Sequence, residues 1–375
     1  MTGALASFNM RPIGVFFVII SLVLPAWAKT PERVVKIGVI APLAGSSAVI
    51  GDEITRTVNL VADGLKHRST RYSYQFLFED GRAGVDSAST TALRKLTDLD
   101  DVRFFIVATS GEILQVGHLA ERLDLLMIAP YATAPAVSKL GQRIFRTAIN
   151  FERGADLLAS YIRKRGDLPL ALLTEEHAFT WGVSDALRKQ LLNDIASNES
   201  YPLDESDLRT VLLRARAKHP KAYYFSCARP ITCAAVIKQA RTLGITEQIY
   251  SFLHMSDPDF LRAARSDANG VRFLSSPDQG NQSPRFIEFQ RKYREQYQSG
   301  PGNDFLQRST YDAVNAVIDG IEAVGASPSE VSRYLHGYEV EGALGLVRFD
   351  ASGDIEDLNY VLKEIADGSI TTPSG

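Results

Sequence analysis

The chain has 375 residues, with 41 lysines and arginines, 44 aspartates and glutamates, and a formal net charge of −3 at pH 7. A surface so nearly neutral argues against nucleic acid or an anionic membrane as the partner. The length allows two domains of ordinary size, each with its own core. A hydrophobic content of 45% with 23% charged residues is typical of a globular protein and excludes a disordered one.

The first 28 residues have the layout of a secretory signal peptide. Arg11 precedes an apolar run over 13–24, and Ala26 and Ala28 place small residues before a cleavage point expected after Ala28. The run is too short to span a bilayer comfortably, and an uncleaved anchor is the alternative. We therefore expect a mature chain that is free in the periplasm, with no insertion into the membrane.

From residue 34 the chain alternates between apolar strands and amphipathic helices. In chain order, the pattern predicts strands over 34–45, 72–80, 102–111 and 125–133, with helices over 52–65, 88–99 and 113–123 between them. Continuously apolar strands separated by helices indicate a parallel sheet that is covered on both faces.

The same alternation begins again after residues 143–150. The pattern predicts a helix through Leu157 and Tyr161, strands over 168–176, 221–227, 248–253 and 271–276, and helices over 183–195, 208–217 and 231–243 with a short one at Phe260. The rhythm then changes to helices over 284–298, 305–324 and 328–335, followed by two strand-like runs within 344–365 around a turn at Asp350, Gly353 and Asp354.

The two cysteines, Cys227 and Cys233, would lie in an oxidising compartment. The sequence leaves open whether they form a disulfide or remain two free thiols. Without clustered histidines they do not form a metal site. The chain has no GxGxxG, GxxxxGK[ST], HExxH or GxSxG motif, and its six histidines are scattered. We expect no cofactor, no metal and no enzymatic activity.

Residues Thr109, Ser110 and Gly111 end one buried strand and begin a helix. Free N–H groups and a hydroxyl at the positive end of a helix dipole suit a carboxylate or another anion. The alternative is that Ser110 is a helix N-cap without a ligand.

The segments KIGVIAPLAG, LLMIAPYATAP, RTAIN, YYFSC, KQARTLGI and RFDASGD, in this order and spacing, resemble the leucine/isoleucine/valine-binding protein family. These are type I periplasmic binding proteins of branched-chain amino acid ABC transporters. The resemblance covers essentially the whole mature chain. It implies an α/β clamshell of two Rossmann-like lobes joined by three hinge crossings, which we place near Asn150, Pro277 and Asp350. The first lobe would take residues 34–149 and 278–350, and the second 150–277 and 351–368.

The resemblance also implies a ligand site between the lobes, at the carboxyl ends of the strands. Ser110 matches the family's carboxylate-binding serine, and Thr133 and the backbone of Tyr131 match the neighbouring loop. Trp181 and Gly182 match an aromatic–glycine pair that covers the ligand from the second lobe, while a Trp packed under its loop is the alternative. Ile50 and Phe305 fall near pocket-wall positions.

The chain departs from the family where an acidic residue should pair with the ligand ammonium, since Leu253 and His254 stand there. Arg229 stands near the family's second-lobe tyrosine. We therefore include Arg229 and His254 among the ligand residues and expect an aromatic or dicarboxylic acid rather than leucine. An insertion could instead bring Asp257 or Glu175 into the vacant role.

These features together predict the substrate-binding component of an ABC importer, which binds a small carboxylate-bearing solute as a monomer and delivers it to a permease in the inner membrane. The alternative is a periplasmic sensory module that presents its ligand-bound form to a receptor. Both need the same closure of two lobes around a ligand.

Overall fold

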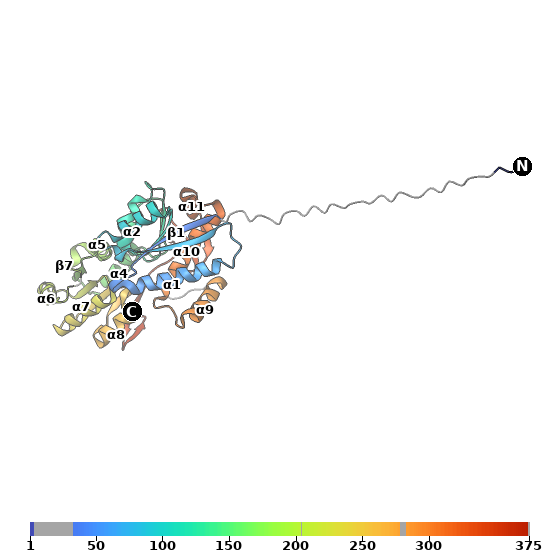
Figure 1. Ribbon diagram of the computed structural model, residues 1–375. Helices are drawn as coiled ribbons and strands as arrows, with labels where there is room; N and C mark the ends of the chain where they lie inside the picture. The colour runs from blue at the N-terminus through green and yellow to red at the C-terminus, as the bar shows by residue number, and fades with distance from the viewer. Residues whose placement is uncertain (4–32, 204, 278–282, 374–375) are drawn as a thin grey trace. The chain divides into compact units, whose positions relative to one another are not determined.

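The computed structural model describes residues 1–3, 33–203, 205–277 and 283–373. Nearly all of the predicted signal peptide, like residues 278–282, lies outside these ranges. After residue 32, the described part of the chain is built on one parallel sheet and one largely parallel sheet with helices on both faces, which confirms the predicted α/β class (Figure 1).

The first sheet has five strands in the order β2-β1-β3-β4-β5, all parallel to their neighbours. Its strands are β1 (Val34–Ala41), β2 (Ser73–Asp80), β3 (Phe104–Val107), β4 (Leu126–Ala129) and β5 (Ile144–Arg146). The helices associated with it are α1 (Ala48–Leu65), α2 (Ala88–Arg94), α3 (Ser110–Val116), α9 (Pro284–Tyr297), α10 (Asp304–Val324) and α11 (Pro328–Leu335). We call this sheet with its helices the first lobe.

Alternate residues of the central strands enter two separate cores, as a sheet covered on both faces requires. In β3, Phe104 and Ile106 pack with residues of α1 and α10, whereas Phe105 and Val107 pack with residues of α2 and α3. The helices α1 and α10 run side by side (Figure 1), which places the late segment of the chain on the early sheet.

The second sheet has seven strands in the order β14-β13-β10-β9-β8-β6-β7. Its strands are β6 (Leu170–Glu175), β7 (Ile195–Tyr201), β8 (Ala222–Ser226), β9 (Gln248–Phe252), β10 (Arg272–Ser275), β13 (Val361–Ala366) and β14 (Ser369–Thr371). The first five are parallel, and β13 and β14 add antiparallel strands at one edge. Its helices are α4 (Phe151–Arg165), α5 (Ala178–Leu191), α6 (Arg209–Arg216), α7 (Pro230–Thr242) and α8 (Pro258–Ala264), and we call this unit the second lobe.

Besides shifts in the ends of several elements, such as α1 and α3, three larger differences from the sequence-based prediction stand out. Helix α5 begins at Ala178 rather than Val183. Residues 195–201 form the edge strand β7, which was not predicted because its sequence is largely polar. The two runs within 344–365 do not share a sheet, because β12 (Leu346–Arg348) pairs with β11 (Glu339–Glu341) in a separate hairpin while β13 joins the second lobe.

Two of the connections between the lobes meet at a buried ion pair. Arg146, at the end of β5, donates from Nε and Nη2 to the Asp354 carboxylate at 2.5 and 2.6 Å. Asn150 donates to the same carboxylate at 2.9 Å. Burial opposes ionisation of Asp354, but the charge and hydrogen bonds of Arg146, together with hydrogen bonds from Asn150 and Ser138, outweigh it and lower the pKa of the carboxyl. The ion pair therefore joins the segment near Asn150 to the segment near Asp350, which are the first and third of the expected crossings. The lobe boundaries themselves stay a prediction, which the sheet memberships support.

Candidate ligand-binding site

The first-lobe side of the site is made where β3 gives way to α3. Thr109 and Glu112 form a capping box, in which the Glu112 carboxylate accepts from the Thr109 backbone N–H at 3.0 Å and from its hydroxyl at 3.1 Å. The N-cap of α3 is thus Thr109, so the alternative that Ser110 is the cap is wrong. Ser110 is the first residue of the helix and is 2% exposed.

The Ser110 hydroxyl oxygen accepts the Ala134 backbone N–H at 3.1 Å. That bond uses an acceptor lone pair, so the hydroxyl proton is available to an acceptor such as a ligand carboxylate. Tyr131 lies beside this position because it forms a parallel bridge with Thr109 at the end of β4.

The second lobe contributes residues that follow three of its parallel strands. His177 and Phe179 come after β6, Ala228 follows β8, and Leu253 and His254 follow β9. They line one cavity together with residues of the first lobe. The full lining is Ser47, Ile50, Ala83, Thr109, Ser110, Gly111, Tyr131, His177, Phe179, Ala228, Leu253 and His254. The carboxyl ends of the strands of both sheets thus face one another, which is where open α/β sheets bind ligands.

The two lobes already touch at the edge of this cavity. His177 N-caps α5 by accepting the Phe179 N–H at Nδ1, and its Nε2 lies 3.1 Å from the Ala83 carbonyl oxygen of the first lobe. A Cβ added to Gly111 would lie 2.1 Å from that carbonyl oxygen and 3.1 Å from His177 Cε1. Only a residue without a side chain permits this approach.

Both cavity histidines are electrically neutral near pH 7. Burial lowers the pKa of His177, and burial likewise lowers the pKa of His254 to about 4. The cavity is therefore lined by apolar groups, hydroxyls and neutral imidazoles, and among its lining residues none carries an acid.

Arg229 lies in an adjoining cavity with Ser46, Arg82 and His177 rather than in the central one. Its guanidinium donates to Ser46 Oγ of the first lobe at 2.5 Å and lies 3.4 Å from Glu175 Oε1. Glu175 also accepts the Ala228 N–H and the Thr232 hydroxyl, both at 2.7 Å. Glu175 is therefore engaged within the second lobe, so the arrangement does not favour it as a partner for a ligand ammonium.

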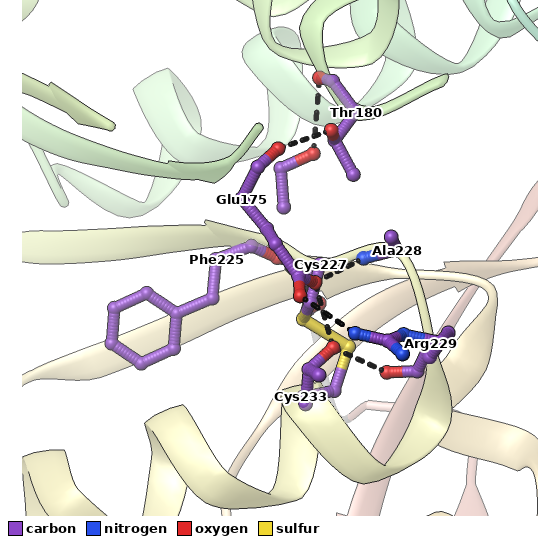
Figure 2. Close-up of a disulfide and its surroundings, with 10 residues drawn as sticks. Glu175, Thr180, Phe225, Cys227, Ala228, Arg229 and Cys233 are labelled. Atoms are coloured by element: carbon purple, nitrogen blue, oxygen red, sulfur yellow. Dashed lines mark hydrogen bonds and ion pairs between the residues drawn. A yellow bond between two sulfur atoms is a disulfide. The ribbon is translucent and has the colours of Figure 1, made fainter. Parts of the chain in front are cut away.

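The turn that carries Ala228 and Arg229 is closed by a disulfide between Cys227 and Cys233, whose Cα atoms are 5.3 Å apart. Figure 2 shows the Glu175 side chain beside this bridge, with its carboxylate directed at Ala228 and Arg229. The question left open by the sequence is answered in favour of the disulfide. It anchors a turn that contributes Ala228 to the cavity wall.

Three further expected residues, Trp181, Thr133 and Phe305, do not line the central cavity, and Phe305 lines another cavity with Asp304 and Arg308. Trp181 is 51% exposed, because the early start of α5 brings His177 and Phe179 to the cavity instead. Thr133 is buried next to Ala134, and its hydroxyl has no hydrogen-bond partner within the described residues. The structure thus brings Ser110, Tyr131 and His254 together with Ile50. Sequence reasoning missed His177, Phe179 and Ala228, although the strand ends before them were a usable signal.

A second cavity adjoins the first and shares Ile50, Tyr131 and His254 with it. Its walls carry four acids, Asp52 and Glu53 from the first lobe and Asp257 and Asp259 from the second. Arg56 pairs with Asp52 at 2.8 Å, and Asp257 caps α8 by accepting the Asp259 N–H at 2.8 Å. Four carboxyl groups therefore lie beside the central cavity but do not line it.

The family model described as periplasmic binding protein matches residues 34–360, almost the entire chain after the predicted signal peptide. The chain belongs to this family. The Leu/Ile/Val-binding protein BraC3 of Rhizobium johnstonii is 24% identical over 356 residues, which cover 92% of this chain and 95% of that protein. The resemblance stated from the sequence is thereby confirmed, and the relatives are binding proteins rather than enzymes.

Solved structures agree on the fold. The leucine binding protein LivK from Thermotoga maritima has a TM-score of 0.79 at 21% identity and covers 91% of this chain and 98% of its own. A solute binding protein of an ABC transporter from Rhodopseudomonas palustris, solved with p-hydroxybenzoic acid, has a TM-score of 0.78 at 16% identity and covers 91% and 96%. In the part of the chain that is described, no helix is long and apolar enough to cross a membrane.

Proposed function

We propose that this periplasmic binding protein is the substrate-binding component of an ABC importer and that it holds a small carboxylate between its lobes. The observation that carries the proposal is the shared cavity, in which Ser110 and Tyr131 of the first lobe face His177, Phe179 and His254 of the second. A ligand in this position touches both lobes, so its binding energy favours the closed arrangement over an open one.

The carboxylate end of the ligand is assigned to Ser110. Its hydroxyl retains a proton to donate, and its position at the start of α3 places a charge-assisted hydrogen bond where water is largely excluded. The body of the ligand contacts the apolar and aromatic wall formed by Ile50, Phe179 and Leu253. Names of relatives that include leucine, isoleucine and valine, and the p-hydroxybenzoic acid of the Rhodopseudomonas structure, support a carboxylic acid as the ligand class.

The delivery partner is an inner-membrane permease, and the location is the periplasm. The family match and the signal-like segment ahead of Ala28 support both. The protein acts as a monomer in this proposal.

The test is a thermal-shift screen against amino acids, amides, aromatic acids and small dicarboxylates, followed by calorimetry of each hit. A ligand at 100 times its dissociation constant stabilises the folded state by roughly 2.7 kcal/mol, which is a readily measured shift. The expected result is at least one carboxylate with a saturable one-to-one isotherm. Stabilisation by uncharged amides alone, with no response to any carboxylate, would overturn the assignment.

A further inference from the structure

A further cavity opens on the first lobe, between the helices α1, α9 and α10. It shares no lining residue with the cavities described above. Leu60 and Val61 of α1 and Phe289 of α9 form its apolar wall, and Tyr311 and Asn315 of α10 form a polar floor, all five of them buried. We call it the helical cavity. Its volume of about 290 Å³ has room for a small molecule rather than a single water.

Three cationic side chains surround the opening of the helical cavity. Arg68 follows the end of α1, and Arg285 and Lys292 lie on α9, all three exposed. The Arg285 guanidinium donates to Asn315 Oδ1 and lies over the Tyr311 ring, 5.9 Å from its centroid. The Arg68 guanidinium forms no ion pair within the part of the chain that is described. Positive charge is thus concentrated where the cavity meets solvent.

The cavity lining carries one acid, Glu288, and that acid is already engaged. Glu288 forms an ion pair of 2.6 Å with Arg291, which does not line the cavity, and its carboxylate lies 3.7 Å from Lys292. The guanidiniums of Arg68 and Arg285 therefore have no other carboxylate in the lining. Like charges at one opening repel each other, and a bound dianion would replace that repulsion with attraction.

The Tyr311 hydroxyl lies within reach of both guanidinium charges. Burial raises the pKa of this hydroxyl to about 12, although the charges of Arg285 and Arg68 act in the opposite direction. The hydroxyl is therefore protonated near pH 7 and can donate a hydrogen bond to an anion in the cavity.

Gly64 leaves the helical cavity open. It lies in the last turn of α1 and lines the cavity, and a Cβ added there would meet no packing neighbour within 4 Å. Its φ is not positive, so the backbone does not require a glycine either. Glycine is less favourable than alanine in a helix. The space that this glycine leaves empty is therefore a second indication of a ligand.

We propose that the helical cavity is a second ligand site, which binds a phosphate monoester attached to an apolar or aromatic body. A phosphate monoester carries a charge between about −1.5 and −2 at pH 7, which balances two guanidiniums better than a carboxylate does. The planar fork of arginine also suits its oxygen atoms. The body of the ligand lies against Leu60, Val61 and Phe289. This site is separate from the proposed carboxylate site between the lobes and does not depend on it.

The test is calorimetry of the mature chain with phenyl phosphate and with inorganic phosphate. We expect a one-to-one isotherm for phenyl phosphate and an affinity about 10-fold or more above that of inorganic phosphate, because the ring buries apolar surface against Phe289. Arg68→Gln should lower the affinity for phenyl phosphate by about 10-fold or more, since it removes a charge-assisted hydrogen bond.

Two further variants separate occupancy of the cavity from general attraction to positive charge. Gly64→Leu fills the cavity without changing any charge, and it should also lower the affinity for phenyl phosphate by about 10-fold or more. Arg294→Gln removes an exposed arginine of α9 that does not line the cavity, and this matched control should bind as the wild type does. Thermal unfolding checks that each variant is folded.

Absence of phenyl phosphate binding to the wild type would overturn the proposal. Wild-type affinity in folded Arg68→Gln and Gly64→Leu variants would overturn it as well. Binding that is lost in Ser110→Ala but kept in Gly64→Leu would place the anion between the lobes and would also contradict it. Cosedimentation with vesicles that contain phosphatidic acid, whose headgroup is a phosphate monoester, identifies the source of the ligand. Retention that is lost in Gly64→Leu assigns the site to a lipid headgroup, and no retention assigns it to a soluble ester.

Discussion

Ser110 is the residue on which the carboxylate assignment depends most. Ser110→Ala removes a hydroxyl aimed at a desolvated anion, so we expect ligand affinity to fall by about 1–3 kcal/mol. The fold should persist, because the hydroxyl makes one hydrogen bond to the protein, with the Ala134 N–H. Calorimetry with the best carboxylate from the screen measures the loss. Ser369→Ala, at an exposed position in β14, should bind as the wild type does. Equal affinity in Ser110→Ala would remove this residue from the site.

The carboxyl of Glu112, in the capping box at the start of α3, makes the free energy of unfolding depend on pH. Burial raises the pKa of its carboxyl to about 8, and hydrogen bonds from Thr109 and Ala83 only partly oppose the effect. Between its ordinary value of 4.5 and about 8, the folded chain holds a proton that the unfolded chain releases. The free energy of unfolding should therefore decrease as the pH rises through this window.

Glu112→Gln replaces the titrating carboxyl with an amide of the same shape and should flatten that decrease. Denaturant unfolding at pH 5 and at pH 8 measures the change. Glu341→Gln, at an exposed position, should keep the pH dependence of the wild type. A Glu112→Gln variant with an undiminished decrease would show that this carboxyl is not the titrating group.

The strand ends predicted some of the residues that line the cavity but not all of them, since His177, Phe179 and Ala228 were missed. Ser110, Tyr131 and His254 could be placed because parallel strands end at one edge of a sheet. Arg229 could not, because its position is set by Glu175 and Ser46, which are far from it in the sequence. Trp181 was assigned to the cavity from the family resemblance, but it lies within the first turn of α5, which begins at Ala178, and its side chain is 51% exposed.

At the scale of elements, the turn between β8 and α7 is held by two independent restraints. The Cys227–Cys233 disulfide closes it, and Glu175 accepts hydrogen bonds from Ala228 and Thr232 within it. Replacing both cysteines with serine should lower the free energy of unfolding by roughly 2–3 kcal/mol, as expected for so short a loop.

Ligand affinity of the double serine variant should change by less than about 10-fold, because the Glu175 hydrogen bonds still place Ala228 at the cavity. Denaturant unfolding and calorimetry, both under oxidising conditions, measure the two effects. A variant with wild-type stability but without ligand binding would contradict this division of roles.

The Arg146–Asp354 pair fixes the elements where the lobes connect. Asp354→Asn leaves the arginine, which is 0% exposed, without its counter-charge, and we expect a loss of about 3–5 kcal/mol in the free energy of unfolding. Because Arg146 lowers the pKa of Asp354 despite burial, the stabilisation is present above the ordinary carboxyl pKa and disappears as the pH falls through the folded value.

The exposed pair of Asp357 and Arg348 supplies the matched control. Asp357→Asn should lower the free energy of unfolding far less than Asp354→Asn does, since water screens an exposed ion pair. Similar losses in both variants, measured by denaturant unfolding at pH 7, would contradict a special role for the buried pair.

Element type followed from periodicity wherever the helix or strand was strongly apolar, and α10 and β8 lie close to their predicted bounds. Two elements did not follow from it. The polar strand β7 lacks the apolar pattern because it lies at a sheet edge. The strands β12 and β13 belong to different sheets although only residues 349–360 separate them in the sequence. Which sheet a strand joins depends on the position of strands that are distant in the sequence, and the local pattern of apolar residues does not contain that information.

At the scale of the whole molecule, the lobes make direct hydrogen bonds at two places beside the cavity, Ser46 with Arg229 and Ala83 with His177. A ligand in the cavity adds contacts with both lobes, so its binding energy favours the closed arrangement. The sequence predicted two lobes correctly from the repeated strand–helix rhythm. It could not reveal these cross-lobe contacts, because each joins residues more than 90 positions apart.

The central claim is that a small carboxylate is held between two hinged lobes that close on it. Small-angle X-ray scattering of the mature chain, with and without a saturating carboxylate from the screen, tests this claim most directly. The account predicts that the wild type has a smaller radius of gyration with ligand than without it. At a ligand concentration that saturates the wild type but not Ser110→Ala, the radius of gyration of the variant should not decrease. Superimposable scattering curves for the free and the saturated wild type would contradict it.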